Sequence, residues 1–207
     1  RVGEGDVGLN TGGMGAYAPA PVATEAVRAR AISEIVVPMH EHLSSQDTPY
    51  RGCLYVGLMI DDEGAPSVVE YNVRFGDPET QVTVPLISSD LCELLLAVAE
   101  GRLSGSMPTF SNDHALTVVL AAEGYPGPPV KGRTITGDLS DDTDSVGRAF
   151  IHHAGTGSSD GNIISTGGRV LAATGIAASL AEARELAYRK LSEVQLEGAH
   201  FRRDIGH

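Results

Sequence analysis

One segment constrains the fold more than any other, Val68-Val69-Glu70-Tyr71-Asn72-Val73-Arg74-Phe75, because polar and apolar side chains alternate along it. Side chains of a β-strand point to opposite faces in turn. The alternation therefore predicts a strand with Glu70, Asn72 and Arg74 on one face, at intervals of about 7 Å. The other face is wholly apolar or aromatic and is predicted to be the core face: Val69, Tyr71, Val73 and Phe75.

The polar face suits phosphoryl chemistry. Mg²⁺ takes oxygen ligands, which Glu70 and Asn72 could supply, and the guanidinium of Arg74 is shaped to hold a carboxylate or phosphoryl group at two points. A solvated strand face is an equally good interpretation of the pattern alone. The next residues, 76–81, place Asp77 and Glu79 beside a rigid Gly-Asp-Pro turn, which favours an active-site loop.

The first residues are unusually rich in glycine, and six of the 25 glycines fall within the first fifteen positions. Residues 6–17 match neither a P-loop nor a dinucleotide-binding fingerprint, because they lack a Gly-Lys-Ser/Thr ending and a preceding strand. Such glycines permit close backbone approach and amides directed at an anion, whereas composition alone favours a flexible connector. The interleaved Asn10, Thr11, Met14 and Tyr17 favour a binding segment.

Charge and composition exclude several classes. The formal net charge of −12 argues against a nucleic-acid or anionic membrane surface. No run of about 18 apolar residues is present, and the two cysteines form no C-x-x-C pattern. We therefore expect a cytoplasmic protein without a membrane or nucleic-acid partner, which holds any phosphorylated ligand through a local cluster of groups.

The remaining patterns predict an α+β chain in two lobes. Residues 1–23 are predicted to be a loop, followed by a helix capped by Thr24 and disturbed by Pro38. A hairpin is predicted over residues 53–73, and a second helix begins near Asp90. Residues 101–112 mark a boundary, so we expect domains at 1–105 and 106–207. The second lobe is predicted to contain strands at 115–122, 148–154 and 169–174 and a closing helix capped by Ser179.

Two segments together resemble a known family. The glycine-rich Asn10-Thr11-Gly12-Gly13-Met14-Gly15-Ala16-Tyr17 and the strand and loop from Glu70 to Gln81 are similar to those of phosphoribosylamine–glycine ligases, also called glycinamide ribonucleotide synthetases. Shorter matches extend the resemblance over the whole chain: Gly124-Tyr125-Pro126-Gly127, His153-Ala154-Gly155-Thr156, Gly167-Gly168-Arg169-Val170-Leu171 and Arg203-Asp204-Ile205-Gly206.

The resemblance implies the second half of an ATP-grasp domain followed by a small, mostly β lobe with one closing helix. It implies a ligase of purine biosynthesis that joins glycine to 5-phosphoribosylamine with ATP, through a glycyl phosphate. Glu70 and Asn72 match the family's Mg²⁺ or Mn²⁺ ligands, Arg74 is expected to hold the carboxylate or acyl phosphate, and Asp77 and Glu79 to receive the amine. The glycine-rich segment is expected to bind substrate: Asn10, Thr11, Gly12, Gly13, Met14 and Gly15.

Two departures matter. The strand before the signature offers no acidic ligand in Gly57-Leu58-Met59-Ile60, and the family's phosphoribosyl-binding domain and ATP lid would lie upstream of Arg1. We therefore expect a partial enzyme that needs the missing N-terminal half and has little activity alone. The alternatives are another ATP-grasp ligase or carboxylase, or a non-catalytic nucleotide-binding fragment. Lys131 and Arg169 lie in glycine-rich turns, where a surface position is the favoured interpretation over contact with a phosphate.

Overall fold

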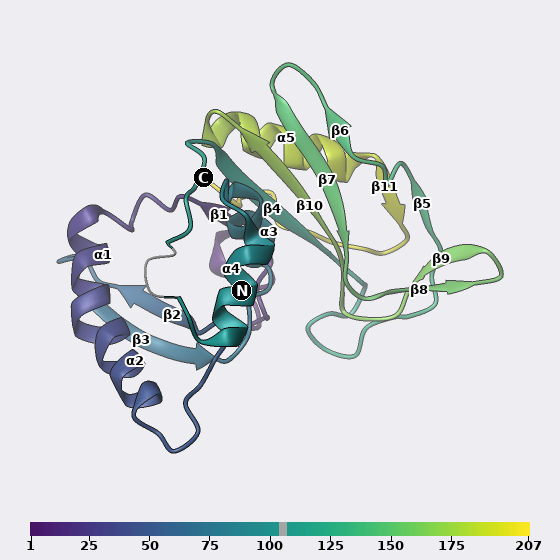
Figure 1. Cartoon of the computed structure of the whole chain (residues 1–207). Coiled ribbons are helices and arrows are strands. Elements are labelled where there is room, and N and C mark those ends of the chain that lie inside the picture. Colours follow the sequence, from purple (N-terminus) through teal and green to yellow (C-terminus); the bar gives the residue numbers. More distant parts are fainter. Residues whose placement is uncertain (104–106) are drawn as a thin grey trace. The chain divides into compact units, whose positions relative to one another are not determined.

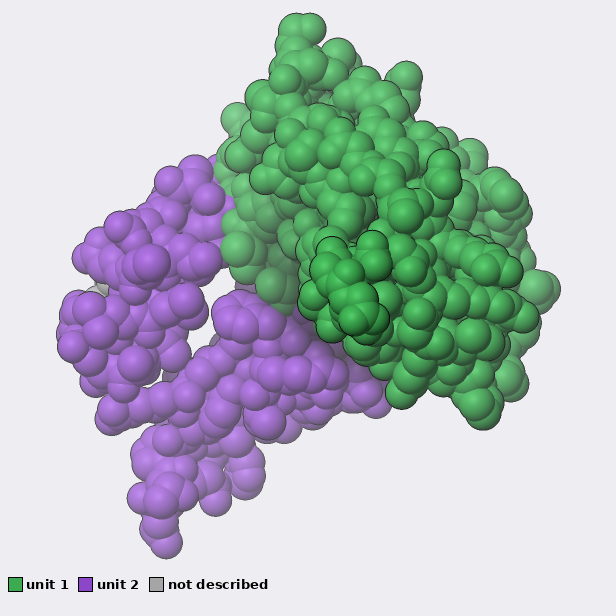
Figure 2. Space-filling view, turned by 90° about the vertical axis from the view of Figure 1, so that its right-hand side faces the viewer, with its two compact units in different colours: residues 1–18, 77–86, 111–207 green, residues 19–76, 87–110 purple. Residues whose placement is uncertain are grey.

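The computed structural model describes residues 1–103 and 107–207, and the chain separates into two compact units. Unit 1 contains residues 1–18, 77–86 and 111–207, and unit 2 contains residues 19–76 and 87–110 (Figure 2). The predicted α+β class is confirmed. The predicted domain boundary between residues 105 and 106 lies outside the described residues and stays a prediction. Two segments of the predicted first domain, 1–18 and 77–86, belong to unit 1 together with residues 111–207.

Unit 1 is built on a five-stranded antiparallel sheet with the order β1-β4-β10-β7-β6 (Figure 1). The strands are β1 (Gly15–Ala18), β4 (His114–Ala121), β6 (Asp142–Thr143), β7 (Gly147–His153) and β10 (Arg169–Ala177). The predicted strands at 115–122, 148–154 and 169–174 are thus confirmed with small shifts. Strand β1 corrects the prediction of a loop over 1–23. It is an edge strand whose partner, β4, lies about a hundred positions away, so no local pattern reveals it.

Both faces of this sheet are covered, which explains why β4 and β10 are buried along nearly their whole lengths. Leu116, Val118 and Leu120 pack with helix α5 (Leu180–Ser192) on one face. Ala115 points to the other face and packs with Val82 and Leu86, which belong to helix α3 (Thr80–Thr83) and the 3-10 turn Val84–Leu86. The segment that follows the signature loop is therefore anchored in this core.

The N-terminal cap of α5 is the one predicted from the sequence. The hydroxyl of Ser179 accepts a hydrogen bond from the backbone N–H of Glu182, which satisfies a donor that the first helical turn leaves unpaired. Two small sheets complete unit 1. One pairs β5 (Ile135–Gly137) with β11 (Val194–Leu196), and the other pairs β8 (Thr156–Ser159) with β9 (Asn162–Ser165).

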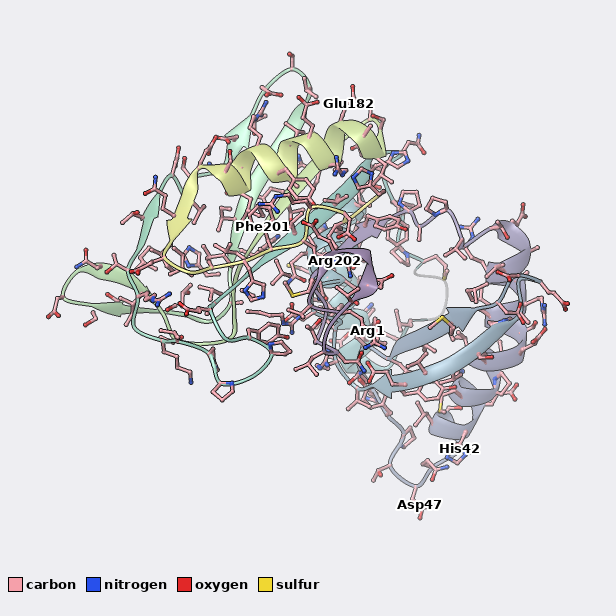
Figure 3. The ribbon with its side chains drawn as sticks, turned by 180° about the vertical axis from the view of Figure 1, so that it is seen from behind. Arg1, His42, Asp47, Glu182, Phe201 and Arg202 are labelled. Atoms are coloured by element: carbon pink, nitrogen blue, oxygen red, sulfur yellow. The ribbon has the colours of Figure 1, made fainter. Side chains whose placement is uncertain are left out.

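The two ends of the chain meet in unit 1. Arg202 donates hydrogen bonds to the carboxylates of Asp204 and Asp6 and to the carbonyl of Arg1. Arg1 and Arg202 are labelled in Figure 3. The N–H of Gly5, in the 3-10 turn Glu4–Asp6, donates to the Asp204 carboxylate. The segment that leads into the glycine-rich residues is therefore tied to the C-terminal segment rather than free.

Unit 2 contains a hairpin of β2 (Tyr55–Ile60) and β3 (Pro66–Asn72) with helices α1 (Glu25–Ala31), α2 (Val37–Ser44) and α4 (Leu91–Glu100). The predicted caps are confirmed, because the side chains of Thr24 and Asp90 each accept a hydrogen bond from the first turn of their helix. A π-helical turn (Ile32–Val36) joins α1 to α2 just before Pro38, and such a turn is a common cause of helix bending. Among the described residues, no helix has the length and apolar character needed to span a membrane.

Candidate functional site

In unit 2, the polar residues of the signature gather where β3 ends. Glu70 pairs with Gly57 and Asn72 with Tyr55, and the register is unbroken between them, so both side chains lie on one face as predicted. Strand β3 ends at Asn72, and Arg74 lies beyond it in a bend. Arg74 turns back to donate to the Asn72 Oδ1 at 3.2 Å and to the carbonyl of Phe75 at 2.8 Å. Its place beside Asn72 comes from the bend rather than from strand alternation.

The predicted core face of this strand is wrong in the described structure. Val69 and Val73 are 64% and 68% exposed, and Tyr71 and Phe75 are also exposed. Val69 is the extra residue of a β-bulge, because Gly57 pairs with Glu70 and the next residue, Leu58, pairs with Val68. Val73 and Phe75 follow the end of the strand. The alternation on which the prediction depends is therefore interrupted at both ends.

Val56 and Tyr71 are cross-strand partners, and the helices of unit 2 lie on their face of the hairpin. The helices do not fill the space against this face. Val56 lines a cavity of about 470 Å³ together with residues from α2, α4 and the loop before β2. The buried apolar side chains of this unit, within the described residues, are only Val27, Ala31 and Ala97. Unit 2 is therefore loosely packed, in contrast to the continuous core of unit 1.

In unit 1, Arg169 connects three segments that are distant in sequence. It is the first residue of β10, and its side chain is 21% exposed. One terminal nitrogen, Nη1, donates to three carbonyls, those of Gly12 at 3.0 Å, Gly13 at 3.3 Å and Asp77 at 2.8 Å. The other, Nη2, pairs with the Asp77 carboxylate at 3.1 Å. Arg169 is therefore partly exposed, and its side chain is bonded to other segments of unit 1.

The Asp77 carboxylate is held from two sides while remaining half exposed. Its Oδ2 accepts from Arg169, and its Oδ1 accepts from the side-chain amide of Gln81 at 2.9 Å. Glu79 precedes helix α3 as its N-terminal cap residue, and its carbonyl accepts from the N–H of Val82. Asp77 and Glu79 are thus fixed by the packing of α3 on the sheet, with the Asp77 carboxylate 49% exposed.

The glycine-rich segment is ordered by contacts within unit 1. The N–H of Gly12 donates to the Tyr125 hydroxyl at 3.1 Å, and the N–H of Gly13 donates to the Thr11 hydroxyl at 3.1 Å. Met14 is buried, Gly15 begins β1, and Asn10 is exposed. The expectation of a run of amides directed at an anion is therefore not met at Gly12 and Gly13, whose N–H groups are already bonded.

Two buried polar atoms near this cluster have no partner in the described structure: Oε1 of Gln81 and Nε2 of His152. His152 lies on β7, and its ring packs edge-on against Phe150 at a centroid distance of 5.0 Å. Burial lowers the pKa of His152, although the negative charges of Asp141 and Asp77 oppose this. A neutral His152 is therefore expected at neutral pH.

A separate group of carboxylates, Asp138, Asp142 and Glu193, is close enough to hold a cation. The ammonium of Lys190 already lies among them, 2.7 Å from Glu193 and 3.3 Å from Asp142. The Lys190 side chain is fully buried. Burial lowers its pKa, but the hydrogen bonds to Glu193 and Asp142 outweigh this and leave the pKa raised. The lysine therefore supplies the positive charge at this place.

The comparisons with known proteins match both parts of the chain. Residues 1–80 match the family model of the phosphoribosylglycinamide synthetase ATP-grasp (A) domain, and residues 115–207 match that of the phosphoribosylglycinamide synthetase C domain. A phosphoribosylamine–glycine ligase of Chlorobaculum tepidum is 47% identical over the whole chain, which covers 48% of that protein. The chloroplastic phosphoribosylamine–glycine ligase of Arabidopsis thaliana is 44% identical, and the chain covers 39% of it.

Solved structures agree. The crystal structure of phosphoribosylamine–glycine ligase from Thermotoga maritima superimposes with a TM-score of 0.84 at 38% identity, over 99% of this chain and 49% of that one. The biotin carboxylase domain of the Hydrogenobacter thermophilus 2-oxoglutarate carboxylase has a TM-score of 0.65 at 20% identity, which shows a shared fold alone. The fold is therefore that of ATP-grasp proteins, as predicted.

Within that class, the chain belongs to the phosphoribosylglycinamide synthetase family. It spans about half the length of its bacterial relatives, or less in longer proteins such as a bifunctional purine biosynthetic protein of Pichia angusta, of which it covers 26%.

The strand, the loop and the glycine-rich segment are evident from the sequence, whereas the contacts of Arg169 and Tyr125 with the glycine-rich segment are not. The signal was present, because Arg169 follows two glycines and Tyr125 lies in a Gly-Tyr-Pro-Gly turn, both within the motifs quoted above. The sequence did not show which residue Arg169 contacts, because Arg169 and Asp77 are 92 positions apart.

Proposed function

We propose that the complete polypeptide carrying this chain joins glycine to 5-phosphoribosylamine with ATP, and releases glycinamide ribonucleotide, ADP and phosphate. The observation that carries the proposal is the match of both parts of the chain to one ligase family, together with the Arg-Phe-Gly-Asp-Pro-Glu block at residues 74–79. The biotin carboxylase domain described above has the same fold, but its 20% identity to this chain does not support a shared substrate.

Glu70 and Asn72 are the residues that would hold Mg²⁺ or Mn²⁺. They fit this use because both are oxygen donors from one strand face, and Glu70 is exposed. The Asn72 Oδ1 accepts from Arg74 and keeps a second lone pair, so a cation and the guanidinium can share it. A bound divalent ion would neutralise charge on the ATP phosphates.

Arg74 holds the carboxylate of glycine and the acyl phosphate made from it. In the first step, a carboxylate oxygen of glycine attacks the γ-phosphorus of ATP, and the bond from that phosphorus to ADP breaks. In the second step, the amine nitrogen of phosphoribosylamine attacks the acyl carbon, phosphate leaves with the bonding electrons, and the nitrogen loses a proton. A planar guanidinium can bond at two points to the carboxylate and then to the acyl phosphate. An ammonium does this less well.

Asp77 and Glu79 receive the amine in this proposal, and the glycine-rich residues 10–13, which unlike Met14 are not buried, contribute to the substrate-binding surface. The half-exposed carboxylate of Asp77 supports this role, because an acceptor that is held in place and open to solvent can bind an ammonium or amine group. In this proposal the protein accelerates the reaction by orienting the reacting groups, and it forms no covalent bond with them.

The test is ADP release by the complete polypeptide with ATP, Mg²⁺, glycine and freshly prepared phosphoribosylamine, with each omitted in turn. Release that requires both glycine and the amine supports the proposal. Release that ignores glycine and responds to bicarbonate or another acid contradicts it and favours a carboxylase or a different ligase. For this chain alone we expect little or no release, because it spans only about half the length of its relatives.

A further inference from the structure

The hydrogen bonds of Arg169 join two separate segments of the chain. Its partners are the carbonyls of Gly12 and Gly13 on one side and the carbonyl and carboxylate of Asp77 on the other. These are the two segments to which the proposed function assigns substrate contacts. Arg169 itself starts β10, the central strand of the sheet between β4 and β7, so its backbone belongs to the centre of the sheet of unit 1.

Of the glycines on the other side of this contact, Gly13 has no room for a side chain and Gly12 has little. A β-carbon at Gly12 would lie 3.1 Å from the guanidinium carbon of Arg169. At Gly13 it would lie 2.5 Å from the ring of Pro78. The glycine turn, the Asp77-Pro78 loop and the guanidinium therefore fit closely against one another, and the placement of each segment depends on the other two.

A guanidinium is suited to this junction because it offers several donors in a fixed plane. It meets four acceptors here, one of them charged. A lysine ammonium has three donors on a flexible stem and would reproduce the charge but not the fixed geometry.

We propose that Arg169 is a positioning residue for the ligase reaction, which holds the Asp77 carboxylate and the glycine turn at Gly12–Gly13 in register for the amine substrate. This inference depends on the proposed function for its substrate. It does not require Arg169 to touch a reacting atom. A small displacement of positioned groups is known to reduce rates by up to about a hundredfold, so the effect of losing this contact is measurable.

The test compares Arg169→Met and Arg169→Lys with the unaltered complete polypeptide. We expect Arg169→Met to raise the KM for phosphoribosylamine by about tenfold or more while the KM for ATP stays within about twofold, and Arg169→Lys to lie between. A merely structural role would lower kcat through loss of folded protein and leave the KM for the amine unchanged. Such a result would overturn the proposal.

The matched control is Arg133→Met. Arg133 lies in the same unit, its side chain is 25% exposed, and it likewise pairs with a carboxylate, Glu123, and a carbonyl, Glu197. It contacts neither segment of the proposed site among its described partners. Arg133→Met is expected to affect stability but not the KM for the amine.

Hydrogen exchange of the same variants separates the two proposals. In Arg169→Met the amides of Gly12 and Gly13 should exchange faster, and in Arg133→Met they should not. If the unaltered polypeptide releases no ADP in response to glycine and the amine, the proposed function fails, while faster exchange specific to Arg169→Met would still show that Arg169 holds the glycine turn in place. Equal exchange in the two variants would contradict it.

Discussion

Gly13 and Pro78 approach so closely that a β-carbon on Gly13 would lie 2.5 Å from the Cδ of Pro78. Gly13 also has a φ of +112°, which residues other than glycine rarely adopt. The two residues come from the glycine-rich segment and the signature loop, both of unit 1. Because of this contact, Pro78 can keep its position only if residue 13 is glycine.

Gly13→Ala is therefore expected to destabilise the chain by about 2–4 kcal/mol, because backbone strain and a steric clash add. Thermal or urea unfolding measures this. Gly161→Ala is the matched control, since Gly161 has a φ of +79° but nothing within 4 Å of the added carbon. It should cost only about 1–2 kcal/mol. Equal losses in the two variants would show that the contact with Pro78 does not matter.

The buried threonines of the sheet give an asymmetric prediction. Thr174 donates to the Thr117 hydroxyl at 2.8 Å, and Thr117 donates to the carbonyl of Ala173 at 3.3 Å. Both side chains are fully buried. Thr117→Val leaves the Thr174 donor without its acceptor and should cost about 1–3 kcal/mol. Thr174→Val leaves Thr117 with its carbonyl partner and should cost less, about 1 kcal/mol.

The double variant, measured by urea unfolding with both single variants, decides the origin of this asymmetry. If an unpaired donor causes the larger loss, adding Thr174→Val to Thr117→Val removes that donor and recovers part of the stability. Simple addition of the two losses would contradict the interpretation.

The acid stability of unit 1 is expected to depend on Asp204. Hydrogen bonds from Arg202, and to a lesser extent from the N–H of Gly5, hold the pKa of the Asp204 carboxyl well below its usual range, although burial opposes this. A lowered folded-state pKa contributes stability that is fully present above the unfolded value, about 3.9, and is lost as the pH falls toward the folded value.

Asp204→Asn should therefore cost about 1.5–3 kcal/mol near pH 7, and the difference from the unaltered chain should shrink below about pH 4. Unfolding free energies measured from pH 7 to pH 2.5 test this. A difference that stays constant or grows toward acid pH would show that the charge of Asp204 is not the cause.

Arg74 tests the proposed chemistry. Arg74→Ala in the complete polypeptide is expected to reduce kcat/KM for glycine by ten- to a hundredfold or more, because about 1.5–3 kcal/mol of charge-assisted hydrogen bonding is lost. Arg74→Lys should recover part of it. Arg30→Ala, which removes an exposed ion pair with Glu34 in the same unit, is the control and should leave activity unchanged. An Arg74→Ala enzyme of normal activity would contradict the assigned role.

Much of the fold could be predicted because its signals are local. Helix α5 begins where the spacing of Ser179 and Glu182 indicates, and strands β4, β7 and β10 coincide with apolar runs bounded by glycine-rich turns. The apolar residues Val69 and Tyr71 of β3 were predicted to be buried, but both are exposed. An apolar face shows that a strand or helix can be buried, but the sequence does not show whether another surface packs against it.

By itself, the sequence determined the α+β class, the helix caps, the hairpin of unit 2, the family resemblance, and the chemistry available at Glu70, Asn72, Arg74 and Asp77. These depend on residues that are neighbours along the chain. Tertiary structure alone decided that β1 pairs with β4, and that Arg169 connects the glycine turn to Asp77. It also decided that Arg202 ties the end of the chain to its first residues. The physical reason is that a hydrogen bond requires proximity in space, and proximity between residues 92 to 201 positions apart is created only when the sheet assembles.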